Sequence, residues 1–313
     1  MLYLLKLEKM NLVSVGTVAF DAVETPFGKT DKIIGGACTY ISLSASYFNS
    51  NPRLISVVGE DFPQETIDLF HQRGISTEGL QIKKGEKTFF WSGKYHTDMN
   101  TRDTLDTQLN VLETFNPVVP DSYQDCDILM LGNLLPAVQY QVLKQIKNRP
   151  KLIVLDTMNF WMETALEDLK KVIRESDVLT INDEEARLLS GEYSLRKAAN
   201  HILKMGPQHL IIKKGEHGAL LFHEEKVFSA PALPLEDVFD PTGAGDTFAG
   251  GFVGYLSNCN EINWENMKTA IIVGCAMASF TVEQFGISRL VEVKGEEINS
   301  RIEAFKELTS FQV

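Results

Sequence analysis

Short apolar runs alternate with longer amphipathic segments along most of this chain. The clearest runs are NLVSVG at 11–16, RLISVVG at 53–59, DILMLGN at 127–133, KLIVLD at 151–156, DVLTIN at 177–182 and HLIIKKG at 209–215. Such runs are typical of strands that are buried on both faces of a parallel sheet, with the intervening segments forming the helices that cover it. The alternation therefore predicts an α/β fold with a mainly parallel central sheet.

The segments between these runs show helical spacing. AIIVGCAMASF at 270–280 is apolar throughout, but it is too short to span a membrane and predicts a buried helix. The segment YSLRKAANHILKMG at 193–206 predicts an amphipathic helix that ends before Gly206. Its apolar face consists of Leu195, Ala198, Ala199, Ile202 and Leu203. Two stretches, 21–34 and 87–112, depart from the alternation and predict antiparallel hairpins.

Polar side chains stand at the ends of several predicted strands, namely Asn133, Asp156, Asn182 and Lys214. The carboxyl ends of parallel strands meet at one edge of a sheet, and ligands of open α/β sheets bind beyond that edge. We therefore expect a ligand site there.

Composition removes several classes of function. The 313 residues carry a formal net charge of −12 without a dense run of Lys or Arg, which argues against nucleic acid as a partner. The sequence has no HExxH motif, and its cysteines, Cys38, Cys126, Cys259 and Cys275, form no CxxC pair. No apolar stretch is long enough to cross a membrane, so we expect a soluble, cytoplasmic protein.

The first ten residues, MLYLLKLEKM, contain a short apolar run that charged residues interrupt, and no signal-peptide cleavage site follows. We expect residues 1–10 to be a disordered extension and residues 11–313 to form one large α/β domain.

The string DPTGAGDTFAGG, from Asp240 to Gly251, carries the strongest chemical signal. It places small residues at a turn that leads into a helix, where the first amides have no intrahelical acceptor and the helix dipole is positive. Gly243, Ala244 and Gly245 therefore suit a phosphoryl group, which small residues allow to approach the backbone closely. Asp246, in the first turn of the helix, is placed to accept a proton from a substrate hydroxyl.

This string resembles the second signature of the ribokinase, or PfkB-type, family of carbohydrate and nucleoside kinases, and the resemblance covers about residues 11 to 290. It is not a Walker phosphate loop: Gly28-Lys29-Thr30 matches only the tail of that motif. The resemblance implies a three-layer αβα ribokinase-like fold in which 21–34 and 87–112 form a small β lid. It also implies ATP and Mg²⁺, with transfer of the γ-phosphoryl group to a primary hydroxyl and with Asp246 as the base.

Two N-terminal motifs predict the acceptor side. Asp21 ends the segment GTVAFD, and its carboxylate can accept two hydrogen bonds from vicinal sugar hydroxyls. Gly35 and Gly36 resemble the first family signature, where paired glycines let the acceptor lie against the backbone. Sugar kinases of the family place an Asn four residues after the second glycine, whereas this chain has Tyr40, whose ring favours stacking on a nucleobase.

Further residues are candidates for the acceptor pocket. Asn133 is the polar group at the end of its strand, and Arg102 is placed either to clamp an anionic group or to pair with Asp103 or Asp106. Aromatic rings nearby either stack on the acceptor or form the core of the lid, and these are Phe20, Phe89, Phe90 and Trp91.

The donor side is predicted from two later motifs. Asn182 and Glu185 match the family's NxxE pattern, which implies Mg²⁺ held near Glu185 through water, while capping of the helix is the structural alternative. Lys214, Gly215 and Gly218 lie in IIKKGEHGALLF, which resembles the nucleotide-binding segment of the family.

Several alternatives stay open. Asp240 and Thr242 match positions that bind a monovalent cation in some family members, so activation by K⁺ is a further expectation. The acceptor is a nucleoside, such as adenosine, or a neutral sugar. A sugar phosphate and a non-catalytic sensor of the same fold are the alternatives, although a sensor needs no base and cations near the lid are few: Lys29, Lys32, Lys94 and Arg102. Exposed lid strands predict a monomer or a lid-mediated homodimer.

Overall fold

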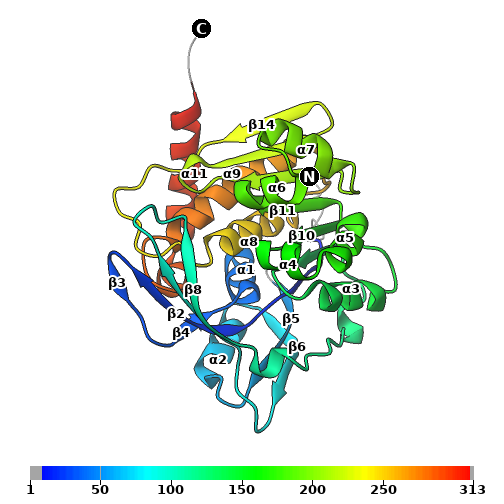
Figure 1. The fold of residues 1–313 in the computed structure, drawn as a ribbon, viewed down its shortest axis with the longest axis vertical. Helices are drawn as coiled ribbons and strands as arrows, with labels where there is room; N and C mark the ends of the chain where they lie inside the picture. The colour runs from blue at the N-terminus through cyan, green and yellow to red at the C-terminus, as the bar shows by residue number, and fades with distance from the viewer. Residues whose placement is uncertain (1–8, 50, 311–313) are drawn as a thin grey trace, which may run out of the picture.

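Two β-sheets organise the chain in the computed structural model, which describes residues 9–49 and 51–310 (Figure 1). In this part of the chain the larger sheet has nine strands in the order β14-β13-β12-β11-β10-β9-β1-β5-β6. The runs identified in the sequence form its parallel centre: β1 (Leu12–Val15), β5 (Arg53–Gly59), β9 (Ile128–Leu131), β10 (Leu152–Asp156), β11 (Val178–Asn182) and β12 (His209–Lys213). The predicted mainly parallel sheet is confirmed.

The remaining strands complete the two edges of this sheet. β6 (Ser76–Lys83) pairs in parallel with β5, while β13 (Ala219–His223) and β14 (Lys226–Ala230) add antiparallel strands at the opposite edge.

Helices cover both faces of the sheet, because its strands are apolar on both sides. Val13 and Val15 of β1 face one core, whereas Leu12 faces the other, as the alternation of side chains along a strand requires. The first core packs under α3 (Pro136–Gln145), α5 (Leu166–Glu175), α6 (Asp183–Ser190) and α7 (Leu195–Leu203). The second packs under α1 (Ala37–Ser46), α8 (Ala244–Leu256), α9 (Trp264–Thr281) and α11 (Gly295–Thr309). The result is the expected three-layer αβα arrangement.

Shorter helices connect these layers. They are α2 (Gln64–Gln72), α4 (Asn159–Thr164) and α10 (Ser288–Glu292), together with 3₁₀ turns at Asn110–Leu112, Asp121–Tyr123 and Gly215–His217.

The smaller sheet combines segments that lie far apart in the sequence. Its strands run in the order β3-β2-β7-β8, and they are β3 (Gly28–Lys29), β2 (Ala19–Thr25), β7 (Phe90–Tyr95) and β8 (Arg102–Gln108). β4 (Ile33–Gly35) also pairs with β2, and β2 and β7 run parallel. We call this sheet the lid; its strands lie to the left of the larger sheet in Figure 1. The ring of Phe27, at the β2–β3 turn, packs 5.3 Å from that of Phe239, which holds the lid beside the loop before α8.

α8 packs closely between α1 and α9, as its glycines predict. A Cβ atom on Gly250 would lie 2.3 Å from the carbonyl oxygen of Ile41, and one on Gly251 would lie 2.9 Å from the side chain of Met277. Glycine therefore lets three backbones approach one another at this point. This packing fixes the start of α8, which carries Asp246.

The N-terminal prediction is tested only in part. Residues 1–8 of the predicted extension lie outside the described residues. Met10, the last residue of that stretch, is buried, and its amide donates to the carbonyl of Ser257 at 2.9 Å. Disorder up to residue 10 is therefore wrong for Met10, because its side chain joins the core under α8 and α9.

The predicted buried helix at 270–280 is confirmed, because this segment lies within α9. No helix in the described ranges is long and apolar enough to span a bilayer. All four cysteines are free thiols.

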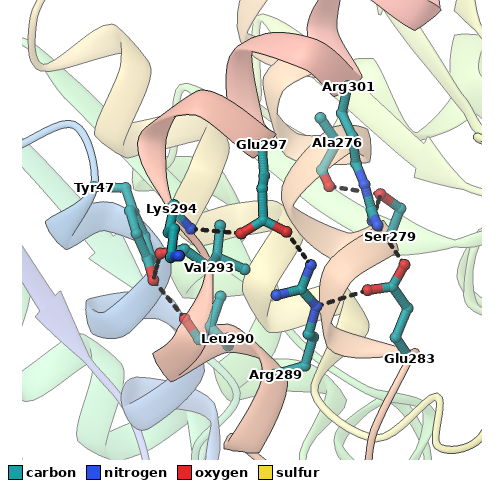
Figure 2. Close-up of polar contacts among 10 residues, drawn as sticks. All are labelled: Tyr47, Ala276, Ser279, Glu283, Arg289, Leu290, Val293, Lys294, Glu297 and Arg301. Atoms are coloured by element: carbon teal, nitrogen blue, oxygen red, sulfur yellow. Dashed lines mark hydrogen bonds and ion pairs between the residues drawn. The ribbon is translucent and has the colours of Figure 1, made fainter.

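A cluster of ion pairs joins the C-terminal helices to α9 (Figure 2). Glu283, just beyond α9, pairs with Arg301 of α11 and, at 2.9 Å, with Arg289 of α10. Arg289 also pairs with Glu297 of α11. The guanidinium of Arg301 lies 3.5 Å from the centre of the Phe280 ring, so packing and charge act together. We call these residues the C-terminal ion cluster.

This cluster supports the site through the segment that follows α9. The amide of Gly286 donates to the carboxylate of Asp240 at 3.0 Å, and the carbonyl of Val282 accepts from the amide of Phe239 at 2.8 Å. The C-terminal ion cluster thus anchors the segment that positions Asp240.

Replacing Arg301 by Met should lower the free energy of unfolding by about 1–3 kcal/mol, because it removes a charged hydrogen-bond partner from partly buried Glu283. Lys306→Met, on the same helix, is the matched control. Lys306 pairs with Glu303 in an exposed position, and such pairs contribute about 0–1 kcal/mol. Urea unfolding of both variants measures the difference, and equal losses would contradict the role of the cluster.

Candidate active site

The loop from Asp240 and the first turn of α8 form the centre of the site. Gly243 is the N-cap of α8 and has a φ of 75°, in the left-handed region that favours glycine. A Cβ atom at this position would lie 2.4 Å from the ring of Tyr40. Both the turn and the close approach of α1 therefore require a glycine.

Open backbone amides make this turn suitable for an anion. The amides of Gly243, Gly245 and Asp246 have no hydrogen-bond acceptor in the described part of the chain. The Ala244 amide, in contrast, donates to the carbonyl of Pro241 at 3.2 Å. The predicted use of the Ala244 amide is therefore corrected, because the turn itself occupies this donor. The remaining amides lie at the positive end of the helix dipole.

Asp246 projects from this turn with a free carboxylate. Its side chain makes no hydrogen bond to any residue of 9–49 or 51–310, which leaves its oxygens open to a substrate. Burial, together with the charge of Asp156, raises its pKa to about 7, against the opposing charges of Lys213 and Arg102. A carboxylate with a pKa near neutral is suited to act as a general base.

Lys213, the last residue of β12, enters the site, although no sequence motif predicted it. Its Nζ lies 3.1 and 3.3 Å from the two carboxylate oxygens of Asp156, at the end of β10. It also lies 3.0 Å from the position that a Cβ of Gly245 would take. Burial lowers the pKa of Lys213, but the charges of nearby carboxylates raise it by more, so the amine stays protonated.

The prediction named the neighbouring Lys214 instead. The side chain of Lys214 forms no ion pair or hydrogen bond with the described residues. Two adjacent lysines have the same chemistry, and only the register of β12 decides which one reaches Asp156. The cue available in the sequence was that Lys213 continues the strand, whereas Lys214 opens the turn.

The acceptor-side motifs come together beside this turn. Asp21 is 5 % exposed, and a Cβ on Gly35 would lie 1.9 Å from its carboxylate oxygen, so the carboxylate lies directly on the glycine backbone. Gly36 starts α1 with a φ of 92°. Burial, helped by the charge of Asp240, raises the pKa of Asp21 to about 7. Asp246 adds to this shift, which places the two carboxylates within range of each other's charge.

Tyr40 does not offer the stacking surface that was predicted. Its side chain is 1 % exposed, and its ring lies against Gly243, so no ring face is open to a nucleobase. Its hydroxyl is buried without a hydrogen-bond partner among the described residues. Phe20 likewise belongs to the core. The prediction of stacking on Tyr40 is wrong because α1 and α8 pack together over its ring.

Arg102 reaches the site from the lid. Asp103, one of its predicted partners, hydrogen-bonds His96 at 3.0 Å instead. Within the described ranges Arg102 forms no ion pair, and its charge opposes the raised pKa values of Asp21, Glu185 and Asp246. Pairing with a neighbouring aspartate is therefore excluded, and a role towards an anionic group remains.

The side chain of Asn133 contacts the α4 segment. Its side-chain oxygen accepts from the indole of Trp161 at 2.9 Å, and its amide nitrogen lies 3.2 Å from the sulfur of Met158. These contacts hold the Asn133 side chain against the α4 segment, and its assignment as a substrate ligand stays a prediction.

Glu185 and Asn182 form a capping box at the start of α6. The Asn182 side chain accepts from the Glu185 amide, and the Glu185 side chain accepts from the Asn182 amide, each at 2.7 Å. Burial raises the pKa of Glu185 to about 7, against the charge of Lys213. No three His, Cys, Asp or Glu residues in the described chain converge to bind a metal directly. One Glu185 oxygen remains outside the cap, which fits Mg²⁺ held through water.

The two glycines of the predicted nucleotide-binding segment, Gly215 and Gly218, contact different parts of the chain. A Cβ on Gly218 would lie 2.0 Å from the carbonyl of Ala230, so this glycine is required by packing against β14. A Cβ on Gly215 would lie 2.4 Å from the side-chain oxygen of Asn100, in the turn between β7 and β8. The lid therefore reaches the nucleotide segment.

Asp240 is a buried carboxylate without a countercharge. It is 1 % exposed, and its two oxygens accept from the amides of Thr242 and Gly286 at 2.9 and 3.0 Å. No cationic side chain of the described residues pairs with it. The Thr242 hydroxyl lies 3.3 Å from that of Tyr95 in the lid.

Comparison with known proteins finds similar sequences and folds among kinases. The family model described as pfkB family carbohydrate kinase matches residues 10–294. The chain is 26 % identical to a cytidine kinase of Thermococcus kodakarensis, covering 84 % of this chain and 96 % of that protein. The nucleoside kinase structure from Methanocaldococcus jannaschii has a TM-score of 0.75 at 21 % identity and covers 95 % of this chain and 99 % of that one. A ribokinase II from E. coli in complex with ATP and Mg²⁺ has a TM-score of 0.76 at 18 % identity, with 94 % and 99 % coverage.

Proposed function

Because the chain belongs to the pfkB family of carbohydrate kinases, we propose that it transfers the γ-phosphoryl group of ATP to the primary hydroxyl of a nucleoside. The family makes the chain a phosphotransferase with an alcohol acceptor. The choice of a nucleoside over a sugar is supported by the cytidine kinase and nucleoside kinase among its relatives.

One structural observation carries the choice of a neutral acceptor over a sugar phosphate. Lys29 and Lys94 both pair with Glu24, at 3.6 and 2.6 Å, and Lys32 pairs with Asp61 at 3.1 Å. Each of these three lid cations lies next to a carboxylate of the protein, with Glu24 shared by two of them. Arg102 alone of the cations named for the lid has no carboxylate partner in the described residues. A phosphate on the acceptor would therefore find Arg102 as the one unpaired cation among those named for the lid, within the described residues.

In this proposal each residue has a distinct task. Asp21 accepts hydrogen bonds from the ribose hydroxyls, which turns the primary hydroxyl towards Asp246. Asp246 takes the proton of that hydroxyl as its bond to phosphorus forms, because a free alcohol is too weakly acidic to be deprotonated beforehand. The amides of Gly245 and Asp246 stabilise the charge that develops on the phosphoryl oxygens.

The donor side is completed by α6 and the lid. Glu185, whose second oxygen is outside the capping box, would hold the water shell of Mg²⁺, which neutralises phosphate charge when it is bound. Asn182 and Gly215 flank the nucleotide in this arrangement. The lid excludes water from the phosphoryl group, which prevents ATP hydrolysis.

ADP release from Mg-ATP across adenosine, cytidine, inosine, neutral sugars and sugar phosphates tests this function. Turnover with a nucleoside supports the proposal. Selective turnover with a sugar or a sugar phosphate would replace the acceptor while retaining the reaction. Binding of a nucleoside without turnover would leave a sensor of the same fold.

We also propose that K⁺ binds beside Asp240 and Thr242. The buried Asp240 carboxylate accepts from the amides of Thr242 and Gly286 and faces no cationic side chain of the described residues, so it has uncompensated charge for a monovalent cation. Exchange of Na⁺ for K⁺ at constant ionic strength should raise kcat severalfold. Equal rates in both salts would remove this site from the proposal.

Acid should suppress the reaction below about pH 7. Asp246 acts as a base only when deprotonated and Asp21 binds hydroxyls best as a carboxylate, and burial raises the pKa of both to about 7. kcat/KM should therefore fall about 10- to 100-fold per pH unit on the acid side, according to whether one or both groups limit it. A pH profile of kcat/KM measures this, and a flat profile down to about pH 5 would contradict both assignments.

A further inference from the structure

Lys213 lies near three parts of the candidate site. These are the proposed base Asp246, the anion-binding turn at the start of α8, and Glu185 on the metal side. The Nζ of Lys213 lies 3.0 Å from the Cβ position of Gly245, immediately beside one of the open amides of α8. Its positive charge lowers the pKa of both Asp246 and Glu185, so it acts on both carboxylates. A Cβ at position 245 would make a tight contact with the amine, so the glycine lets Lys213 lie close to the turn.

The hydrogen bonds of this amine are incomplete. A lysine ammonium has three N–H donors, and the described partners of Lys213 are the two oxygens of Asp156, at 3.1 and 3.3 Å. One donor is therefore left beside the open amides of the turn. The Lys213 side chain keeps 18 % of its surface exposed, so this donor is open to a group that enters the site. A phosphoryl oxygen held by the open amides of α8 is the kind of acceptor that a lysine ammonium binds.

We propose that Lys213 is a catalytic residue that binds the γ-phosphoryl group of ATP, and that Asp156 positions it. This inference rests on the proposed kinase function. The γ-phosphoryl group is the one that must lie between Asp246 and the α8 amides, since the acceptor hydroxyl attacks it there. The position of Lys213 beside Gly245 and Asp246 thus assigns it to this group in particular.

The transfer step uses Lys213 as a fixed charge. The acceptor oxygen forms a bond to the γ-phosphorus, its proton passes to Asp246, and the bond to the β–γ bridging oxygen breaks with its electron pair leaving on ADP. Lys213 stays protonated throughout and donates to a phosphoryl oxygen, while Asp156 holds its Nζ in place.

Nucleotide binding separates this role from a structural one, because ADP lacks the γ-phosphoryl group. Lys213→Met keeps the length of the side chain and removes the charge. Calorimetry in Mg²⁺ without acceptor should show ATP binding weakened about 10- to 100-fold and ADP binding changed less than about twofold, as expected for one charged hydrogen bond. kcat should fall by a similar factor, and the acid limb of kcat/KM should move to higher pH, because Asp246 loses a nearby positive charge.

Lys197→Met is the matched control, since Lys197 is exposed on α7 and makes no side-chain contact with the site. It should bind both nucleotides as the unmodified protein does. If Lys213→Met fails to fold, Asp156→Asn provides the test. This variant releases the Lys213 amine from its carboxylate partner, which should still reduce the preference for ATP over ADP. Equal weakening of both nucleotides, or no weakening, would overturn the assignment. An unmodified protein that turns over no acceptor would instead overturn the proposed function.

Discussion

Asp246→Asn should lower kcat by about 100- to 10,000-fold, the range that general-base catalysis contributes. The amide has nearly the shape of the carboxylate but does not take up the proton of the acceptor hydroxyl. The half-buried Asp246 side chain makes no hydrogen bond within the described residues, so the exchange breaks no contact there. The loss should therefore fall on the chemical step, which steady-state kinetics with the best acceptor from the panel will measure.

Binding and stability distinguish this outcome from simple misfolding. The dissociation constant for Mg-ATP should stay within about threefold, because Asn still presents its backbone amide to the phosphate. Asp121→Asn is the control, since its side chain is 98 % exposed and lies in a 3₁₀ turn outside the site. Turnover within about tenfold of normal would remove Asp246 as the base.

Gly243→Ala should abolish most activity and destabilise the fold together. A residue with a Cβ in the left-handed region costs about 1–2 kcal/mol. The new Cβ would also lie 2.4 Å from the ring of Tyr40, which is fully buried and has no space to retreat, and such overpacking adds about 1–3 kcal/mol. Relief of this clash must displace the turn that carries the open amides. We expect kcat to fall at least about 100-fold, in line with loss of an oxyanion donor.

Gly191→Ala separates the two causes of the loss. Gly191 caps α6 with a φ of 72°, and a Cβ there would meet nothing within 4 Å. This variant should lose only about 1–2 kcal/mol of stability, with normal kinetics. Urea unfolding and steady-state kinetics of both variants give the comparison. Equal stability losses, or normal turnover in Gly243→Ala, would contradict the contact between Tyr40 and the turn.

Much of the candidate site could be predicted from local sequence motifs. The turn at Gly243 and the position of Asp246 in the first turn of α8 each depend on a few neighbouring residues and one helix end. The contacts of Asn133 with Trp161 and Met158 could not be predicted, because the conformation of the α4 segment cannot be inferred from the strand that precedes it.

By itself the sequence determined the parallel sheet, the buried apolar segment 270–280 and the motif that opens α8, because hydrophobic periodicity and turn residues act over a few positions. The tertiary structure alone decided that Tyr40 is sealed by α8, that Lys213 rather than Lys214 meets Asp156, and that β2 pairs with β7. Each of these depends on strand register and on packing between segments distant in the chain. The free energy that selects them comes from burial and pairing across the whole fold, which no local pattern encodes.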